Sequence, residues 1–305
     1  MPMAGTAAGR SPVSTPWLSA RGRAVAMAVL SALTVLYLCA RFLQVFPGKV
    51  SMLSVVALHV VPSALFALIH GAMSYRFRGI LSFMAICLLI GNAFENVGVL
   101  TGFPFGRYYF TDLMGPKLFA VPILLGLAYV GMSYLSWMLA RLILGTVRSP
   151  LVGWQVVTLP LLASLIMVAW DLSQDPVWAT ILRAWVWRQG GAYFGVPVSN
   201  FLGWYLTVYV IFQLFALYLR NYEVNSHPLA SNYWRLAIIF YAISAAGNIL
   251  LVIPRARPSI VFDPAGVPWR VSDITWTCAL VSIFTMGVFA LIAWIRLGDL
   301  KLEAS

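Results

Sequence analysis

Charged side chains are scarce in this sequence. Asp, Glu, Lys and Arg make up 10% of the 305 residues, whereas hydrophobic residues make up 61%. A soluble domain carries roughly 25% charged residues, so this chain has too few to cover a surface that faces water. Its apolar runs are long and repeated, as membrane-spanning helices require. The composition therefore excludes a water-soluble globular protein and predicts an integral membrane protein.

Histidine and cysteine are also scarce, with three of each. Cys39, Cys87 and Cys278 lie far apart in apolar stretches and form no metal-type or redox-type pair, so we expect buried free thiols. His59 and His70 lack ligand spacing, and a metal site there would need carboxylates from elsewhere. Three histidines cannot fill the His-rich boxes of membrane di-iron desaturases. We therefore expect no metal, no redox cofactor and no oxygen-dependent chemistry.

The net charge of +11 comes from 20 Lys and Arg against 9 Asp and Glu. In a soluble protein this balance would suggest nucleic acid. Here the basic residues occur singly or in pairs between apolar runs, as in Arg21 with Arg23 and Arg76 with Arg78. This distribution is typical of charges that set topology and face anionic lipid headgroups. We expect membrane lipids, and no nucleic acid, as partners.

The hydropathy pattern predicts an all-α, polytopic transmembrane bundle of about eight spans, with seven to nine compatible. We expect them at residues 24–46, 50–72, 79–100, 118–144, 151–171, 201–220, 234–253 and 275–297. No segment is long and polar enough for a separate soluble domain, so residues 21–300 are predicted to form one integral-membrane domain. Residues 1–20, rich in Ser, Pro, Gly and Ala, are predicted to be a disordered tail without a cleavable signal.

A count of eight has a topological consequence. Both termini then lie on one face, whose slightly larger number of basic residues favours the cytoplasm of a multi-pass cell-membrane protein. The connections 101–117 and 172–200 both fall on the other face. These are the two most unusual stretches of the sequence.

The first unusual stretch contains Asn92, Glu95 and Asn96 within an apolar span. The spacing of i, i+3 and i+4 puts all three on one helix face, which must point into the bundle. An intramembrane carboxyl group is a candidate functional group. The alternative is structural: Glu95 pairs with an arginine of a neighbouring helix, or sits protonated among the amides.

The loop that follows is dense in Gly, Pro and aromatic residues, with Arg107 and Asp112 embedded in it. Irregular backbone at membrane depth is tolerated only where it is buried in protein or lines a cavity. The run of aromatics therefore predicts a lined pocket, although a plain interfacial belt explains each of them singly. These residues are Phe103, Phe105, Tyr108, Tyr109 and Phe110.

The second unusual stretch contains Asp171 and Asp175, four residues apart at the end of an apolar run. They share a face if the helix continues that far. Two like charges at that spacing repel, which favours one of the pair keeping its proton, as a general acid requires. Helix-end chemistry is the alternative, with Pro176 as a stop and Asp175 as a cap.

At these residues the sequence resembles the carotenoid hydratases of the CruF type. The first matching block runs from Glu95 to Tyr109 and adds Thr111-Asp112 and Gly115-Pro116-Lys117. The second block comprises Asp171, Asp175-Pro176, Trp187, Gly191, Tyr193-Phe194-Gly195-Val196-Pro197 and Asn200-Phe201-Leu202-Gly203-Trp204. The resemblance covers roughly residues 80–215. Ser173-Gln174 departs from the apolar pair expected between the aspartates, which leaves the local helix geometry open.

The resemblance implies that water is added, without cofactor or metal, to the terminal C1=C2 bond of an acyclic carotenoid such as lycopene, γ-carotene or a C50 type. Other carotenoid enzymes are candidate partners. From the residues alone we expect Asp171 or Asp175 to act as the acid and Glu95 or Asp112 to position the water. The expected substrate-binding residues are Asn92, Asn96, Phe105, Arg107, Tyr108, Tyr109, Trp187, Tyr193, Asn200 and Trp204.

Two other functions fit the same features. Buried carboxylates and aromatic loops also serve a lipophile transporter or a carotenoid-binding scaffold, which inverted repeats would favour, and none is visible. An acid-catalysed isoprenoid cyclase would use the same carboxyl groups and give ring products without added water.

Overall fold

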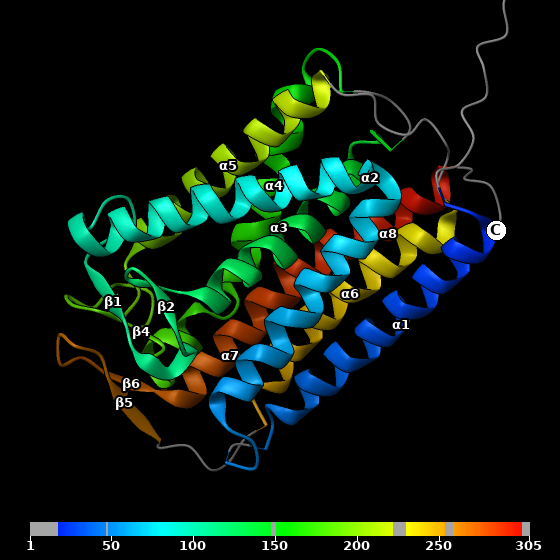
Figure 1. The fold of residues 1–305 in the computed structure, drawn as a ribbon. Helices are drawn as coiled ribbons and strands as arrows, with labels where there is room; N and C mark the ends of the chain where they lie inside the picture. The colour runs from blue at the N-terminus through cyan, green and yellow to red at the C-terminus, as the bar shows by residue number, and fades with distance from the viewer. Residues whose placement is uncertain (1–17, 47, 148–150, 222–229, 254–258, 301–305) are drawn as a thin grey trace, which may run out of the picture.

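A computed structural model describes residues 18–46, 48–147, 151–221, 230–253 and 259–300 (Figure 1). Within these ranges, seven helices are long and apolar enough to cross a membrane. The predicted all-α, polytopic bundle is therefore confirmed. Of the predicted N-terminal tail, residues 1–17 lie outside the described part, and the first helix begins at Ala20.

The helices follow the apolar runs closely. Their bounds are α1 Ala20–Leu43, α2 Met52–Thr101, α3 Ile123–Ile143, α4 Gln155–Leu172, α5 Val198–Arg220, α6 Ser231–Leu250, α7 Val271–Val281 and α8 Val288–Asp299. A π-helical segment, Ser282–Gly287, joins α7 to α8, so residues 271–299 cross the bundle as one span. A second π-helical segment, Val177–Ile181, follows α4.

Helix α2 differs from the prediction. The sequence suggests two spans separated by a short polar segment, but the helix continues for 50 residues and is interrupted only at Arg76, whose φ is 55° and ψ 175°. In Figure 1 the second arm turns away from the first at this point and runs across the bundle. The eight expected spans thus correspond to seven helices, because the second and third are the two arms of α2.

Three short antiparallel strand pairs lie in the connections. They are β1 Tyr108–Phe110 with β4 Trp185–Trp187, β2 Lys117–Leu118 with β3 Val121–Pro122, and β5 Ile260–Phe262 with β6 Pro268–Arg270. Residues 117–122 therefore form a hairpin, and the expected start of the fourth span at 118 is wrong, since α3 begins at Ile123.

The pairing of β1 with β4 joins the two unusual connections. Tyr108 lies opposite Trp187 and Phe110 lies opposite Trp185. Connections 101–117 and 172–200, which the sequence places on one face of the membrane, therefore lie side by side at one end of the bundle. All three strand pairs gather toward this end in Figure 1.

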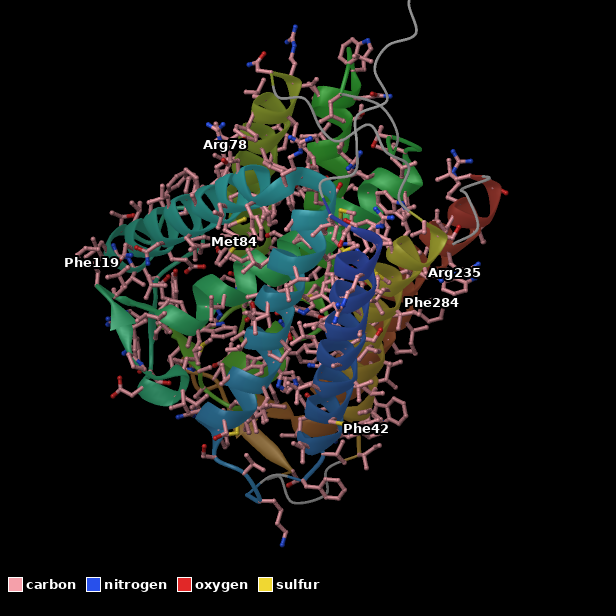
Figure 2. The ribbon with its side chains drawn as sticks, turned by 45° about the vertical axis from the view of Figure 1, so that its right-hand side comes forward. Phe42, Arg78, Met84, Phe119, Arg235 and Phe284 are labelled. Atoms are coloured by element: carbon pink, nitrogen blue, oxygen red, sulfur yellow. The ribbon has the colours of Figure 1, made fainter. Side chains whose placement is uncertain are left out.

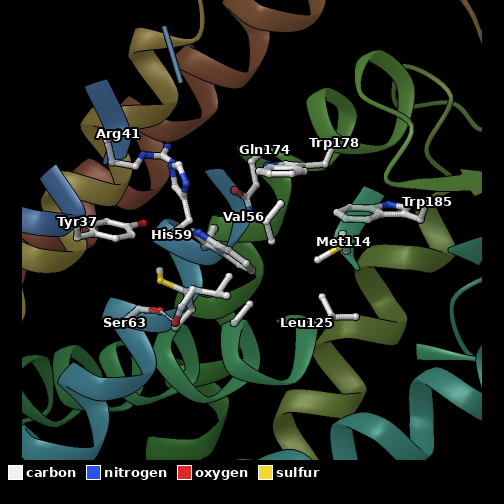
Figure 3. Close-up of a pocket in the computed structure, with 14 residues that line it drawn as sticks. Tyr37, Arg41, Val56, His59, Ser63, Met114, Leu125, Gln174, Trp178 and Trp185 are labelled. Atoms are coloured by element: carbon white, nitrogen blue, oxygen red, sulfur yellow. Dashed lines mark hydrogen bonds between the residues drawn. The ribbon is translucent and has the colours of Figure 1, made fainter. Parts of the chain in front are cut away.

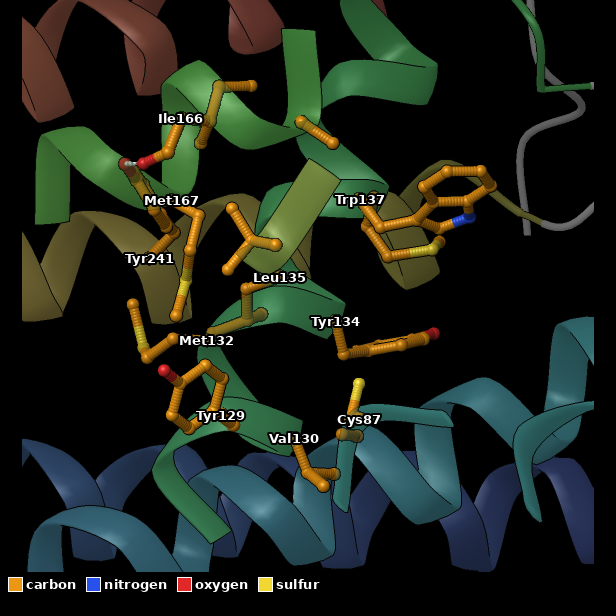
Figure 4. Close-up of a cluster of buried hydrophobic side chains, with 14 of the residues drawn as sticks. Cys87, Tyr129, Val130, Met132, Tyr134, Leu135, Trp137, Ile166, Met167 and Tyr241 are labelled. Carbon is orange, nitrogen blue, oxygen red and sulfur yellow. Dashed lines mark hydrogen bonds between the residues drawn. The ribbon is translucent and has the colours of Figure 1, made fainter. Parts of the chain in front are cut away.

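Helix α3 forms the centre of the bundle. Its side chains Tyr134, Leu135 and Trp137 are fully buried among α2, α4, α5 and α6 (Figure 4). By contrast, Phe42 and Phe284 lie on the outer surface and are 52% and 70% exposed (Figure 2). Apolar side chains at the surface are what a helical bundle in lipid presents to its solvent, so this surface fits a multi-pass membrane protein.

Candidate functional site

Three carboxyl groups are buried at the end of the bundle where β1 meets β4. Glu95 comes from α2, Asp171 from α4 and Asp175 from the turn after α4, and they are 3%, 3% and 1% exposed. Among the described residues, the salt bridges involve other acids, Asp112 and Asp299. Each of the three buried groups is held by neutral hydrogen-bond donors instead.

The two aspartates share one partner. Asn200, in the first turn of α5, donates through Nδ2 to Oδ2 of Asp175 at 2.6 Å and to Oδ2 of Asp171 at 3.2 Å. The indole Nε1–H of Trp185 donates to Oδ1 of Asp175 at 2.8 Å. Helical backbone bonds continue past α4, with Gln174 N donating to Asp171 O at 3.1 Å. This continuation keeps both aspartates on the side of the turn that faces α5.

Two tyrosines hold Glu95. Tyr129 of α3 donates its hydroxyl to Oε1 at 2.7 Å, and Tyr108 of β1 donates to Oε2. Burial and the neighbouring Glu95 carboxyl raise the pKa of the Tyr108 hydroxyl well above its usual range. The Tyr108 hydroxyl therefore keeps its proton and serves as a hydrogen-bond donor.

A cavity of about 270 Å³ lies beside Glu95. Its described lining includes Glu95, Asn200, Leu125 and six aromatic residues, Phe105, Tyr108, Phe110, Trp185, Trp187 and Trp204. Glu95 also interacts electrostatically with Asp171 and Asp175. The cavity therefore has one carboxyl group on its wall, two more behind Asn200, and aromatic rings on most of its surface. We call it the carboxyl cavity.

The ring of Phe105, which lines the cavity, packs between helices α2 and α5. An added Cβ on Gly98 of α2 would lie 2.6 Å from one edge of the Phe105 ring, and one on Gly203 of α5 would lie 2.7 Å from the other. Only glycine permits this approach at both positions. Gly102, with φ of 87°, ends α2 in the left-handed conformation and turns the chain toward β1.

The two asparagines near Glu95, Asn92 and Asn96, have a structural role. Asn96 donates to Asn92 Oδ1 at 3.0 Å and accepts from the backbone N–H of Ala120 at 3.0 Å. They thus anchor the β2–β3 turn to α2. Although Asn92, Glu95 and Asn96 share a broad helix face, Glu95 is the one of these three that lines the carboxyl cavity.

Several other sequence-predicted residues lie away from the cavity. Asp112 has a 99% exposed side chain that pairs with Lys117 at 2.9 Å. Arg107 is exposed, and Tyr109 is 41% exposed with the Arg188 guanidinium 5.3 Å from its ring centroid. Residues of a strand alternate between faces, so β1 turns Tyr108 inward and Tyr109 outward.

Tyr193 lies near the aspartates and outside the cavity lining. Its hydroxyl donates to the backbone carbonyl of Leu172 at 3.0 Å, and burial raises its pKa. Trp204 lines the cavity and stacks on Tyr129, with ring centroids 4.5 Å apart and planes at 6°. This stacking orients the hydroxyl that binds Glu95.

Sequence reasoning missed Tyr129, Trp185 and Leu125 as part of the site. Trp185 stands two residues before Trp187, and strand alternation would have put both on the same face. Tyr129 is a polar group in the long apolar run of α3, which is the signal that singled out Glu95. No local pattern marks Leu125, since an apolar residue in an apolar helix has no distinguishing feature.

Comparison with known proteins gives two matches. The model of a family described as carotenoid biosynthesis protein matches residues 50–261. A bisanhydrobacterioruberin hydratase from Haloarcula japonica is 31% identical over 128 residues, which is 42% of this chain and 41% of that protein. The matched segment thus spans less than half of this relative. No solved structure shows significant similarity.

Proposed function

The chain belongs to the carotenoid biosynthesis protein family, whose model matches residues 50–261, and on that premise we propose that it is a carotenoid hydratase. It adds water to the terminal C1=C2 bond of an acyclic carotenoid ψ-end and yields a tertiary alcohol. The name of the similar Haloarcula japonica hydratase supports this activity. We further propose that it works in the cell membrane, since its substrate dissolves in lipid.

The observation that carries the proposal is Glu95 on the wall of an aromatic-lined cavity, with Asp171 and Asp175 close by and neutral donors as partners. Burying a carboxylate without a cationic partner costs several kcal/mol, which favours the neutral acid. A neutral acid in an apolar site is what protonation of an unactivated alkene needs.

The reaction starts with the carboxyl proton of Glu95. The electron pair of the double bond takes this proton at C2, which leaves a tertiary cation at C1 and a carboxylate on Glu95. The π-faces of Tyr108, Trp187 and Trp204 stabilise the cation. The oxygen of a water molecule then bonds to C1, and the extra proton returns to the carboxylate. One water is added, no electrons are gained or lost, and the acid is regenerated.

Asn200 is the group best placed to orient the water. Its Nδ2 is committed to the two aspartates, whereas its Oδ1 accepts no hydrogen bond from the described residues. Since Asn200 lines the cavity, that oxygen can accept from a water molecule inside it. This assignment makes Glu95 the acid and the aspartates the support of Asn200. The sequence alone suggests different roles, with Asp171 or Asp175 as the acid and Glu95 or Asp112 positioning the water.

The test is the pigment profile of variants expressed in a lycopene-producing host. Glu95→Gln should abolish the product that has gained one water, while Asp171→Asn and Asp175→Asn should lower its yield. Wild-type yield from Glu95→Gln would rule out this mechanism. Mass and chromatography also separate the alternatives, because a cyclase gives a ring isomer and a transporter or scaffold leaves the pigment unchanged.

A further inference from the structure

A second and larger cavity adjoins the carboxyl cavity. It has about 550 Å³ of space and shares Leu125 and Trp185 with its neighbour. Its other lining residues include Arg41, His59, Met132, Trp170, Gln174 and Trp178 (Figure 3). Most of this wall is aliphatic or aromatic. We call it the second cavity.

Two buried basic side chains, Arg41 and His59, lie on one side of this cavity. Arg41 of α1 is 2% exposed and donates through Nη2 to Ser244 O at 3.1 Å and to Asn248 Oδ1. Its Nε lies against Gly247, whereas its Nη1 makes no hydrogen bond with the described residues. His59 of α2 is 8% exposed, its Nδ1 lies 2.6 Å from Val55 O, and its Nε2 is fully buried.

Gln174 adds a third polar group. It is 7% exposed and lines the second cavity, and its side-chain amide makes no hydrogen bond with the described residues. It is also one of the two positions where the sequence departs from the apolar pair expected between Asp171 and Asp175. In Figure 3, Arg41, His59 and Gln174 lie across the cavity from Met114, Leu125 and Trp185. The second cavity is thus polar at one side and apolar at the other.

We propose that the second cavity is a binding subsite for the hydroxyl-bearing end of an isoprenoid chain. A hydroxyl group can accept from the Nη1 group of Arg41 and donate to the oxygen of the Gln174 amide. The aliphatic and aromatic wall takes the hydrocarbon. A water molecule needs several polar partners to be held, so water alone would leave this apolar wall without a matching occupant.

The class of ligand rests on the proposed function, because the alcohol formed in the carboxyl cavity is a hydroxylated isoprenoid end. The shared wall of Leu125 and Trp185 puts the two cavities side by side. The second cavity would therefore hold the product end after hydration.

The test uses the purified full-length protein and two saturated probes that cannot react. One is tetrahydromyrcenol, a monoterpenoid tertiary alcohol, and the other is its parent hydrocarbon. Binding is followed by tryptophan fluorescence, since Trp170, Trp178 and Trp185 line the cavity. The wild type should bind the alcohol about tenfold better than the hydrocarbon, which is the effect of one to two net hydrogen bonds.

The ratio of the two affinities is the quantity to compare, because partition of the probes into detergent cancels between variants. Gln174→Leu should bring the ratio toward that of partition alone while hydrocarbon binding persists, which also shows that the variant is folded. Met132→Leu, on the apolar wall, should leave the ratio unchanged.

Equal binding of both probes by the wild type would overturn the proposal, as would a preference that Gln174→Leu leaves unchanged. A failure of the proposed function is visible separately. Wild-type hydration by Glu95→Gln would remove the mechanism and leave the probe ratio untouched.

Discussion

The side-chain nitrogen of Asn200 lies 2.6 Å from Oδ2 of Asp175, a residue 25 positions earlier in the chain. The same nitrogen donates to Asp171 at 3.2 Å. One neutral amide therefore satisfies two buried carboxyl groups that no described cation reaches. Removal of this amide leaves both groups short of a partner, which makes Asn200 a sensitive point for both folding and activity.

Asn200→Leu should lower the free energy of unfolding by about 1–3 kcal/mol, the cost of leaving a buried polar group unsatisfied. It should also lower the yield of hydrated carotenoid more than tenfold, because the water loses its acceptor. The matched control is Gln213→Leu on the same helix, whose amide bonds to Val156 O far from the carboxyl groups. Thermal unfolding in detergent and pigment analysis are the measurements. Equal effects of the two substitutions would contradict the role of Asn200.

Asp112→Asn should leave the pigment profile unchanged. Its carboxylate is 99% exposed and contacts Lys117 alone among charged groups of the described chain. Exposed ion pairs contribute little because water and salt screen them. The substitution is thus a matched control for Glu95→Gln: both replace a carboxyl group by an amide in the same block of sequence. A loss of product equal to that of Glu95→Gln would show that the loop rearranges around the substrate.

Tyr108→Phe should lower the yield about tenfold or more, because Glu95 loses one of the two hydroxyls that orient it. Since the raised pKa keeps the Tyr108 hydroxyl protonated, its donation should persist to about pH 10. Combined with Glu95→Gln, the substitution should add nothing further, as expected for two residues that act through one contact. Tyr109→Phe, next in the chain and turned outward, is the control and should behave as wild type.

Features that depend on neighbouring residues in the sequence could be predicted, whereas contacts between distant residues could not. The length of each apolar run decides which segments cross the membrane, so most helix ends could be predicted to within a few residues. Asp112 is close to Glu95 in sequence, which suggested a shared role in positioning the water. The structure instead turns its side chain into solvent. Tyr129 reaches Glu95 across 34 residues. That contact arises from the packing of α3 against α2, which no local spacing encodes.

The break in α2 shows the same limit for backbone geometry. Arg76 and Arg78 suggest a polar loop between two spans, and a loop of that length is a common connection. Instead the helix resumes after one residue with a left-handed φ at Arg76. The second arm then carries Glu95 toward β1. Hydropathy locates both arms but contains no information on the angle between them.

Gly98→Ala should destabilise the protein by about 1–3 kcal/mol, the usual cost of overpacking. The new methyl group would meet Phe105 at 2.6 Å and the Tyr108 hydroxyl at 3.0 Å, and Gly203 blocks the far side of the Phe105 ring. The yield should fall as well, because Tyr108 is pushed from Glu95. Gly298→Ala is the control, since no atom of the described residues lies within 4 Å of its added methyl group. A melting temperature for Gly98→Ala equal to that of Gly298→Ala would contradict the packing.

Trp187 allows the cation stabilisation to be separated from folding. Its ring lines the carboxyl cavity with its centroid 4.7 Å from that of Tyr108, and its buried indole N–H finds no hydrogen-bond partner within the described part of the chain. Trp187→Phe therefore removes no protein hydrogen bond and keeps a π-face, whereas Trp187→Leu keeps an apolar side chain without one.

If the aromatic face stabilises the cation, Trp187→Leu should lower the hydration rate by about five- to thirtyfold relative to Trp187→Phe, which corresponds to roughly 1–2 kcal/mol. Both variants lose packing volume, so their melting temperatures should fall together. A comparison of initial rates in isolated membranes, at equal protein levels, measures the difference. Equal rates for the Phe and Leu variants would mean that the ring acts only through its bulk, and the charge on the cation would then have to be balanced by the carboxylate of Glu95.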